Sequence, residues 1–189
     1  GAMLAGVDYV LVGAGIPLES SNPEYGPGQL EINFGPADPL RTADNTALFK
    51  SIVKEIANRR GLRATFMPKP WADQSGSGMH VHSSLSHTSL SGVGASNASG
   101  GNAFGDAVGH PNELMAAWVS GLLAHAPAMS LIMIPTPNGY KRVRPYTFAP
   151  THVHWGDDNR SVLARLTMGA GSANRVEYRS AGADANPYL

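Results

Sequence analysis

The stretch from Gly76 to Leu85 constrains the fold of this chain more than any other, because its side chains alternate in character after a turn of small residues. A period of two is that of a β-strand, so the stretch predicts a strand with one apolar face and one polar face. The polar face holds His80, His82 and Ser84, and the other face holds Met79, Val81, Ser83 and Leu85.

Two histidines at i and i+2 of a strand point the same way, so both can reach one ligand or metal. On this stretch alone, such a pair is as often structural or merely exposed as it is functional. The preceding glycines favour the functional interpretation, because glycine lets a substrate approach the backbone closely.

The bulk properties exclude several classes of protein. A chain of 189 residues fits one domain or a large piece of one. Lys plus Arg and Asp plus Glu both number 14, so no net field draws the chain to nucleic acid or to a membrane surface. Apolar runs such as Leu131–Ile134 are too short to span a bilayer. The absence of cysteine fits a reducing compartment. We therefore expect a cytoplasmic protein with neither nucleic acid nor membrane as partner.

The coarse pattern indicates helices, short strands and one long loop. A helix is predicted from Asp38-Pro39 to Gly61 and a short buried strand over Ala64–Met67, stopped by Pro68. Two further helices are predicted, one over Pro111–His125 and a separate one from Pro127 to Pro135, the first with Leu114, Met115, Trp118, Leu122 and Leu123 inward. Residues 86–109 are rich in Ser, Gly and Asn and predict a flexible loop. Residues 1–3 read as a scar of tag removal, which leaves 4–189 as the domain sequence.

Four other stretches alternate as strands do. Gln29–Phe34 places Glu31 on a polar face, which equally fits a solvated surface. Thr151–Trp155 and Ser161–Leu166 are also predicted as strands. Arg175–Arg179 places Arg175, Glu177 and Arg179 on one face, and such a face is costly to bury without anionic partners or a metal.

These polar faces together suggest one kind of chemistry. Oxygen-rich ligands with a single histidine suit Mg²⁺ or Mn²⁺ better than Zn²⁺, and several arginines beside such ions suit a polyphosphate and its transferring phosphoryl group. The sequence contains neither a Walker loop nor a Gly-x-Gly-x-x-Gly turn, which excludes the nucleotide sites built on those motifs. The donors are Glu24, Glu31, His80 and Glu177, and the cations are Arg142, Arg160, Arg165, Arg175 and Arg179.

In order and spacing, a series of motifs over nearly all of the chain resembles the glutamine synthetase superfamily. The motifs are Glu24 and Glu31, the runs 65–70, 76–82, 138–142, 159–161 and 175–179, and the final Ala-Asn-Pro-Tyr-Leu of 185–189. The resemblance implies an α+β fold, a curved and mainly antiparallel sheet backed by helices, here incomplete. It also implies a ring-shaped homo-oligomer in which the neighbouring subunit completes each site.

The same resemblance implies roles for individual residues. The reaction it implies forms γ-glutamyl phosphate from glutamate and ATP, and an amine then displaces the phosphate. It matches Glu24, Glu31, His80 and Glu177 to metal ligands, and Ser75, Gly76, Arg142 and Arg179 to glutamate contacts. It matches His82, Ser84, Arg160, Arg165 and Arg175 to ATP or phosphoryl contacts, with Arg160 and Arg179 counted as catalytic.

Two positions depart from the pattern of that superfamily. Phe148 stands before Ala149-Pro150, where glutamine synthetases carry the glutamate that binds ammonium and takes its proton. A phenyl ring can do neither, but it can line a pocket for an alkyl amine. Ser75 replaces an asparagine beside the glycine turn, which weakens one glutamate contact.

Three hypotheses follow from the resemblance and its departures. The first is a ligase of glutamate and an organic amine, closest to the γ-glutamylpolyamine and γ-glutamylethanolamide synthetase-like branch. The second is an ammonium-using glutamine synthetase with another base, and the third is a non-catalytic structural or regulatory relative. Since the resemblance places an N-terminal domain, a Glu-x-Glu strand and a C-terminal part outside these residues, we expect the isolated chain to be inactive.

Overall fold

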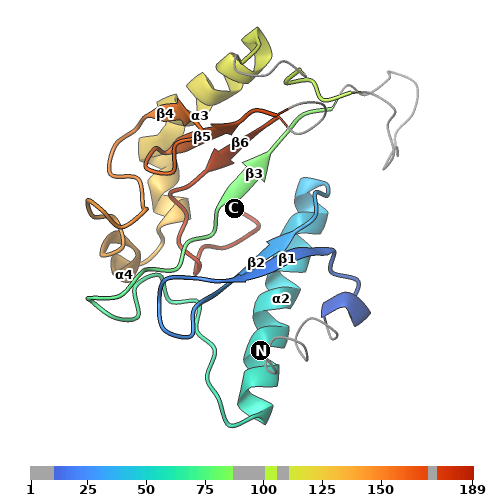
Figure 1. Cartoon of the computed structure of the whole chain (residues 1–189), viewed down its shortest axis with the longest axis vertical. Coiled ribbons are helices and arrows are strands. Elements are labelled where there is room, and N and C mark those ends of the chain that lie inside the picture. The colour runs from blue at the N-terminus through green and yellow to red at the C-terminus, as the bar shows by residue number, and fades with distance from the viewer. Residues whose placement is uncertain (1–10, 87–100, 106–110, 170–173) are drawn as a thin grey trace.

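The computed structural model describes residues 11–86, 101–105, 111–169 and 174–189, and combines two β-sheets with helices behind them (Figure 1). This mixed architecture with open sheets confirms the predicted fold class. In chain order the elements are β1 Leu18–Pro23, β2 Leu30–Phe34, α2 Pro39–Arg59, β3 Val81–Ser83, α3 Glu113–Met133, α4 Pro137–Tyr140, β4 Trp155–Asp157, β5 Ala164–Thr167 and β6 Arg175–Tyr178.

The larger sheet has the strand order β3-β6-β5-β4 and positions most of the predicted site. β6 pairs antiparallel with both β3 and β5, and β4 pairs parallel with β5. The register sets His82 opposite Glu177 and Arg165 opposite Glu177. Three strands that each carry polar residues therefore lie side by side, although the sequence separates them by up to about ninety residues.

Helix α3 covers the back of this sheet (Figure 1). Met115 and Val119 are buried with Phe104 against Leu166 and Val176, and Ala126 contacts the neighbouring cluster around Tyr178. Within the described ranges, α3 is the one helix long and apolar enough to cross a membrane by length and composition. Its buried contacts with β5 and β6 are those of a helix that packs on a sheet.

The smaller sheet is the hairpin β1–β2, which packs on α2 (Figure 1). Asp38 caps α2 by accepting a hydrogen bond from the Arg41 N–H (3.0 Å), as the sequence predicts. The Phe49 ring on α2 meets Phe34 of β2 edge-on at 5.3 Å between centroids. This aromatic contact fixes the hairpin against the helix.

Two predictions about the helices were wrong. The sequence predicts a break at Pro127, but α3 continues through it to Met133. Pro127 lies on the exposed side of the helix, and the packing of its neighbour Ala126 with Leu163 and Tyr178 outweighs the lost backbone hydrogen bond. Leu114 and Trp118 are exposed rather than inward (43% and 37%), because the buried stripe runs through their neighbours Met115 and Val119.

The predicted strands also changed. Ala64–Met67 is neither a strand nor buried, because no described segment pairs with it and both Thr65 and Met67 are exposed. The Met67 N–H donates instead to the Thr65 hydroxyl (3.1 Å). The strand expected over Gly76–Leu85 is confined to Val81–Ser83, and Val81 is 41% exposed rather than on a buried face. The strand expected over Thr151–Trp155 begins only at Trp155, and that over Ser161–Leu166 only at Ala164. The supposed tag scar and most of the predicted 86–109 loop lie outside the described residues.

Candidate active site

Glu177 on β6 is the centre of the charged cluster, and it is 2% exposed. Its Oε1 lies 3.0 Å from His80 Nδ1 and also accepts a hydrogen bond from Arg179 Nη1, while its Oε2 accepts from Arg165 Nη1 at 3.0 Å. Burial alone would raise the pKa of Glu177, but the His80 hydrogen bond and the charge of Arg179 hold it well below its ordinary value. Glu177 is therefore an anion held by three strands.

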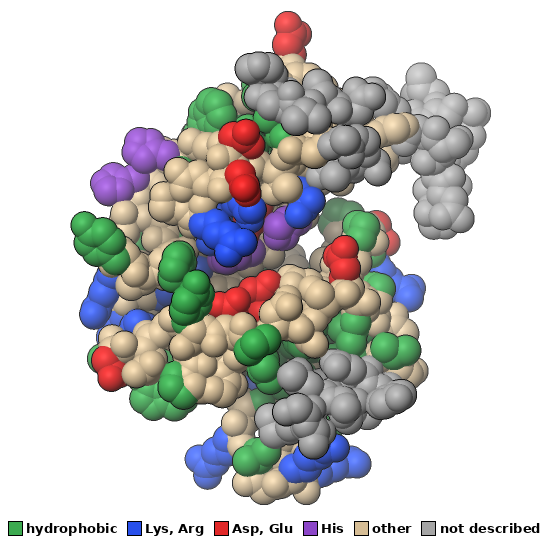
Figure 2. Space-filling model, viewed as in Figure 1, with side chains coloured by type: hydrophobic (Ala, Val, Ile, Leu, Met, Phe, Trp, Pro, Cys, Tyr) green, Lys and Arg blue, Asp and Glu red, His purple; other side chains and the backbone are tan. Residues whose placement is uncertain are grey.

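A second layer of contacts extends this cluster. Arg175 Nε donates to His82 Nδ1 at 3.1 Å, and Arg165 also pairs with Asp158. Burial lowers the pKa of His82, against the charge of Glu177, so its neutral form is favoured. The Arg165 contacts lower the pKa of the exposed Asp158 carboxyl. On the face shown in Figure 2, histidine, basic and acidic side chains gather at the centre, with hydrophobic side chains beside them.

Arg142 is buried at the edge of the cluster, at 4% exposure. It donates to the backbone carbonyls of Ser180 (2.9 Å) and Arg179 (3.1 Å). A Cβ on Gly78 would lie 2.5 Å from Arg142 Nη2, and one on Gly76 would lie 2.7 Å from the Pro68 carbonyl. The glycine turn therefore leaves the space that the Arg142 side chain fills. Burial lowers the pKa of Arg142 to about 10.

The predicted donors Glu24 and Glu31 stand on the β1–β2 hairpin. Burial and the neighbouring Glu31 carboxylate raise the pKa of Glu24, as expected when two carboxylates share one place. The exposed Arg160 lies near enough for its charge to act on Glu24 in the opposite direction. The charge of Arg160 also acts on Arg179 and Asp158, both on the side of the larger sheet.

Gln29 ties the hairpin to the glycine turn. Its side-chain Nε2 donates to the Gly76 carbonyl at 3.0 Å and to the Ser77 hydroxyl at 3.3 Å, and its Oε1 accepts from the Gly26 N–H at 2.9 Å. One amide side chain therefore sets the distance between the Glu24–Glu31 pair and the start of the histidine strand.

Phe148 lies where the hairpin meets the cluster. Its carbonyl accepts a hydrogen bond from Arg179 Nη2 at 3.4 Å, and its ring stacks on Tyr25, with centroids 5.2 Å apart and 23° between planes. Both rings remain largely exposed, Phe148 at 54% and Tyr25 at 73%. The backbone of Phe148 has a φ of +58°, a value that non-glycine residues rarely adopt.

The structure brings most of the predicted site residues together, but not all of them. Ser75 is half-buried beside the glycine turn, and Ser84 is exposed beyond the end of β3. Among the described residues, neither serine forms a hydrogen bond with the charged cluster. Among the described residues, no three His, Cys, Asp or Glu side chains gather as a metal site. The donors instead form two pairs, Glu24 with Glu31 and His80 with Glu177.

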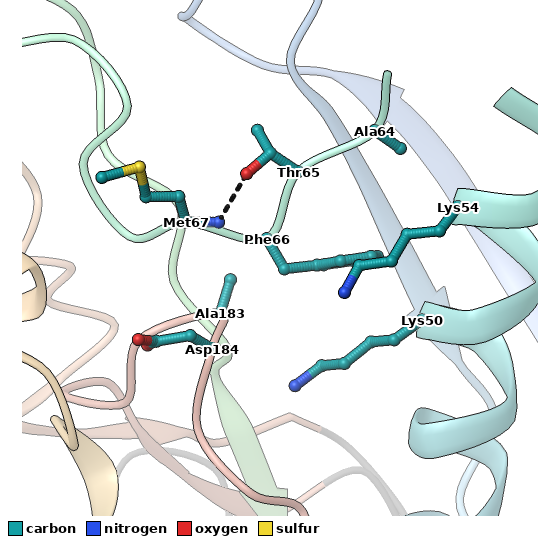
Figure 3. A pocket seen from close by; sticks show the side chains of 8 residues that line it. All are labelled: Lys50, Lys54, Ala64, Thr65, Phe66, Met67, Ala183 and Asp184. Carbon is teal, nitrogen blue, oxygen red and sulfur yellow. Dashed lines mark hydrogen bonds between the residues drawn. The ribbon is translucent and has the colours of Figure 1, made fainter. Parts of the chain in front are cut away.

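A separate hollow of about 410 Å³ lies between α2 and the 64–67 segment (Figure 3). Lys50 and Lys54 extend into it beside the Phe66 ring, at 5.9 and 5.7 Å from its centroid. Lys50 Nζ already donates to the Ala185 carbonyl at 2.8 Å. This hollow shares no lining residue with the Glu177 cluster.

The sequence argument missed three contributors. Gln29 and Tyr25 flank the hairpin donors, and Asp158 pairs with Arg165. The turn composition around Tyr25 did offer a signal, because a large aromatic side chain between turn residues has no helix or strand face on which to pack.

Comparison with known proteins shows the family of this chain. The model for the glutamine synthetase catalytic domain matches residues 2–189. A glutamate–isopropylamine ligase of Pseudomonas sp. is 44% identical over 93% of this chain and 37% of its own length. The glutamine synthetase of Thermus thermophilus is 41% identical over 95% of this chain and 38% of its own. The γ-glutamylputrescine synthetase of Escherichia coli is 37% identical over 92% and 35%.

A solved structure entitled "GmaS/ADP complex-Conformation 1" superposes on 99% of this chain and 42% of its own, with a TM-score of 0.82 and 35% identity. The fold and the family match therefore define the class, that of the glutamine synthetase catalytic domain. The chain belongs to the glutamine synthetase family. It spans somewhat more than a third of the length of the curated relatives it matches.

Proposed function

We propose that the protein to which this chain belongs joins the γ-carboxylate of glutamate to an organic amine, with ATP as co-substrate. The family supplies the ligase class, and its relatives include enzymes named for isopropylamine and putrescine. The acceptor is thus an amine of the alkyl, polyamine or ethanolamine type. The protein acts in the cytoplasm as a ring-shaped homo-oligomer.

The observation that carries this proposal is Phe148. Its ring lies exposed at the junction of hairpin and cluster, while its carbonyl is bonded to Arg179. By resemblance, ammonium-using enzymes have a glutamate at this position. A phenyl ring provides apolar contact for carbon atoms of an amine but no charge that attracts NH₄⁺ and no proton acceptor.

In the first step of the proposed reaction, a γ-carboxylate oxygen of glutamate attacks the γ-phosphorus of ATP, and the bond to the bridging oxygen of ADP breaks. In the second step, the amine nitrogen attacks the γ-carbonyl carbon, the carbon–oxygen bond to phosphate breaks and the amine loses a proton. Arg160, Arg165 and Arg179 offset the charge of the transferring phosphoryl group. The place of glutamate is bordered by Arg142, Gly76 and Ser75. The place of ATP is bordered by His82, Ser84 and Arg175.

The donor residues fit a hard divalent cation. Glu24 with Glu31 would hold one Mg²⁺ or Mn²⁺, and His80 with Glu177 another, since such ions prefer oxygen and take further ligands from water and phosphates. When bound, these ions polarise phosphate oxygens and neutralise developing charge. Within this chain, Arg165 and Arg179 hold the Glu177 carboxylate in place before any ion arrives.

A second candidate is an ammonium-using glutamine synthetase. Several relatives carry that name at similar identity, such as those of Methanocaldococcus jannaschii at 38% and Thermus thermophilus at 41%. In that case a residue other than Phe148 accepts the proton of ammonium.

The two candidates separate in a coupled phosphate-release assay on a full-length protein containing this chain, with ammonium set against a panel of amines. We expect the highest kcat/KM for an organic amine. A highest kcat/KM for ammonium supports the second candidate, and absence of product with every acceptor supports a non-catalytic relative. Because the chain spans little more than a third of its relatives, we expect no amide product from the isolated chain.

A further inference from the structure

Tyr25 and Phe148 form an exposed aromatic pair, which is unusual for two side chains of this size. They come from the hairpin turn and from the segment after α4, more than a hundred residues apart in sequence. Their rings stack at 5.2 Å, and each keeps more than half of its surface in solvent. Large exposed apolar surfaces commonly mark a binding site.

The backbone that presents Phe148 is held in a costly conformation. Tyr146 and Phe148 have φ values of +63° and +58°, which are strained for aromatic residues. Thr147, between them, donates its hydroxyl to the carbonyls of Arg142 (2.9 Å) and Arg144 (2.7 Å) and closes the turn. The turn therefore holds the Phe148 ring out of the core and against Tyr25.

The pair also lies beside the groups that carry the chemistry. Tyr25 directly follows Glu24, and the carbonyl of Phe148 accepts from Arg179, which in turn contacts Glu177. Gln29 fixes the same hairpin turn to Gly76. A ligand whose carbon chain rests on the two rings therefore has its polar group within reach of the hairpin carboxylates and of the arginine cluster.

We infer that Tyr25 is a specificity-determining residue which, together with Phe148, binds the carbon chain of an apolar alkyl monoamine. This inference rests on the proposed function and narrows its acceptor class. The surface offered is aromatic carbon, on which each methylene withdrawn from water improves binding about fourfold. At such exposed rings the second ammonium of a diamine would gain only a weak cation–π contact, whereas a carbon chain gains apolar contact along its length.

The test compares Tyr25→Ala with Tyr146→Ala in a full-length protein containing this chain, using isopropylamine, putrescine and ammonium as acceptors. Tyr146 is the matched control, because it is a fully exposed aromatic of the same strained turn. We expect Tyr25→Ala to lower kcat/KM for isopropylamine about tenfold relative to ammonium. Tyr25→Phe, which keeps the stack, should retain the preference, and Tyr146→Ala should not change it.

Each outcome bears on one claim. If none of the amines stimulates phosphate release by the unmodified protein, the proposed function fails. If it uses amines but Tyr25→Ala and Tyr146→Ala give the same isopropylamine-to-ammonium ratio, the inference about Tyr25 fails while the proposed function stands. A preference of the unmodified protein for putrescine over isopropylamine overturns the assignment to monoamines. Tyr25 is 73% exposed, so the variants should fold, and thermal unfolding of each verifies this.

Discussion

The two donor pairs of the site, His80 with Glu177 and Glu24 with Glu31, are built in opposite ways. Glu177 is buried on β6 and is already held by His80, Arg165 and Arg179. Glu24 and Glu31 stand on a two-stranded hairpin, where they repel each other and where Arg160 is the cation shown to act on Glu24. The negative charge of Glu177 is offset by side chains of the fold itself. The negative charge of Glu24 and Glu31 is left largely without such partners.

This difference separates a carboxylate whose charge the fold already offsets from two carboxylates whose charge a bound cation would offset. A buried carboxylate with hydrogen-bonded cations stabilises the arrangement of β3, β5 and β6. Two adjacent carboxylates cost stability until a cation arrives. A bound cation would therefore stabilise the hairpin more than the larger sheet. The larger sheet is the scaffold that places arginines opposite the hairpin.

The strongest way to break the comparison is to neutralise one carboxylate of each pair. Glu177→Gln leaves buried arginines without their anion and should lower the free energy of unfolding by about 3–5 kcal/mol. Glu31→Gln removes a repulsion and should change it by less than about 1 kcal/mol. Urea denaturation measures both, with the exposed Glu55→Gln as control. Equal losses for Glu177 and Glu31 would contradict the distinction between the pairs.

The second prediction concerns the glycine turn that connects the two regions. Gly78→Ala places a Cβ 2.5 Å from Arg142 Nη2, so that the buried guanidinium has to move, and we expect a loss of about 1–3 kcal/mol. Gly121→Ala in α3, where a Cβ meets no atom within 4 Å, should instead stabilise by up to about 1 kcal/mol. Thermal unfolding distinguishes the two signs, and a neutral Gly78→Ala would mean that Arg142 does not need this space.

The pH dependence of stability should differ in sign between the pairs. The pKa of Glu24 is raised above 4.5, so folding favours its protonated form and stability rises as pH falls through the raised pKa toward 4.5. The pKa of Glu177 is lowered, so its contribution is complete above 4.5 and is lost as pH falls below that value. As the pH is lowered from 7 to 3, the urea midpoint should first rise and then fall. Glu24→Gln should remove the rise and Glu177→Gln should remove the fall. A rise that persists in Glu24→Gln, or a fall that persists in Glu177→Gln, would contradict this assignment.

The smallest expected effect is metal binding by the isolated chain. With two donors in each pair, we expect weak binding, with Mg²⁺ or Mn²⁺ preferred to Zn²⁺. Titration calorimetry on the chain and on Glu31→Gln measures this, and Glu31→Gln should weaken the binding further. Tight stoichiometric zinc binding that is lost on His80→Gln would show instead that the imidazoles choose the metal.

Local patterns predicted the elements of the site well, because a period of two depends only on neighbouring residues. The strands Leu30–Phe34 and Arg175–Tyr178 and the capped start of α2 at Asp38 agree with the structure, although burial does not alternate along either strand. The register that brings Arg165 opposite Glu177 depends on strands far apart in sequence, so periodicity alone could not give it.

The misses have the same physical origin. Whether Ala64–Met67 becomes a strand depends on a pairing partner, and whether Pro127 breaks a helix depends on what packs around it. The stack of Tyr25 on Phe148 joins two turns, for which no periodicity exists. Contacts between turns are therefore the part of the site that needed three-dimensional information.

The central claim, that an aromatic surface in place of a carboxylate selects an organic amine, is tested most directly by Phe148→Glu in a full-length protein containing this chain. The measurement is kcat/KM for ammonium and for the best amine, before and after the substitution. A carboxylate attracts NH₄⁺ and can take its proton, while loss of the ring removes about 1–3 kcal/mol of apolar contact with the amine. We predict a shift of the ratio toward ammonium by roughly ten- to a hundredfold. An unchanged ratio would contradict the claim and leave Phe148 as ordinary packing.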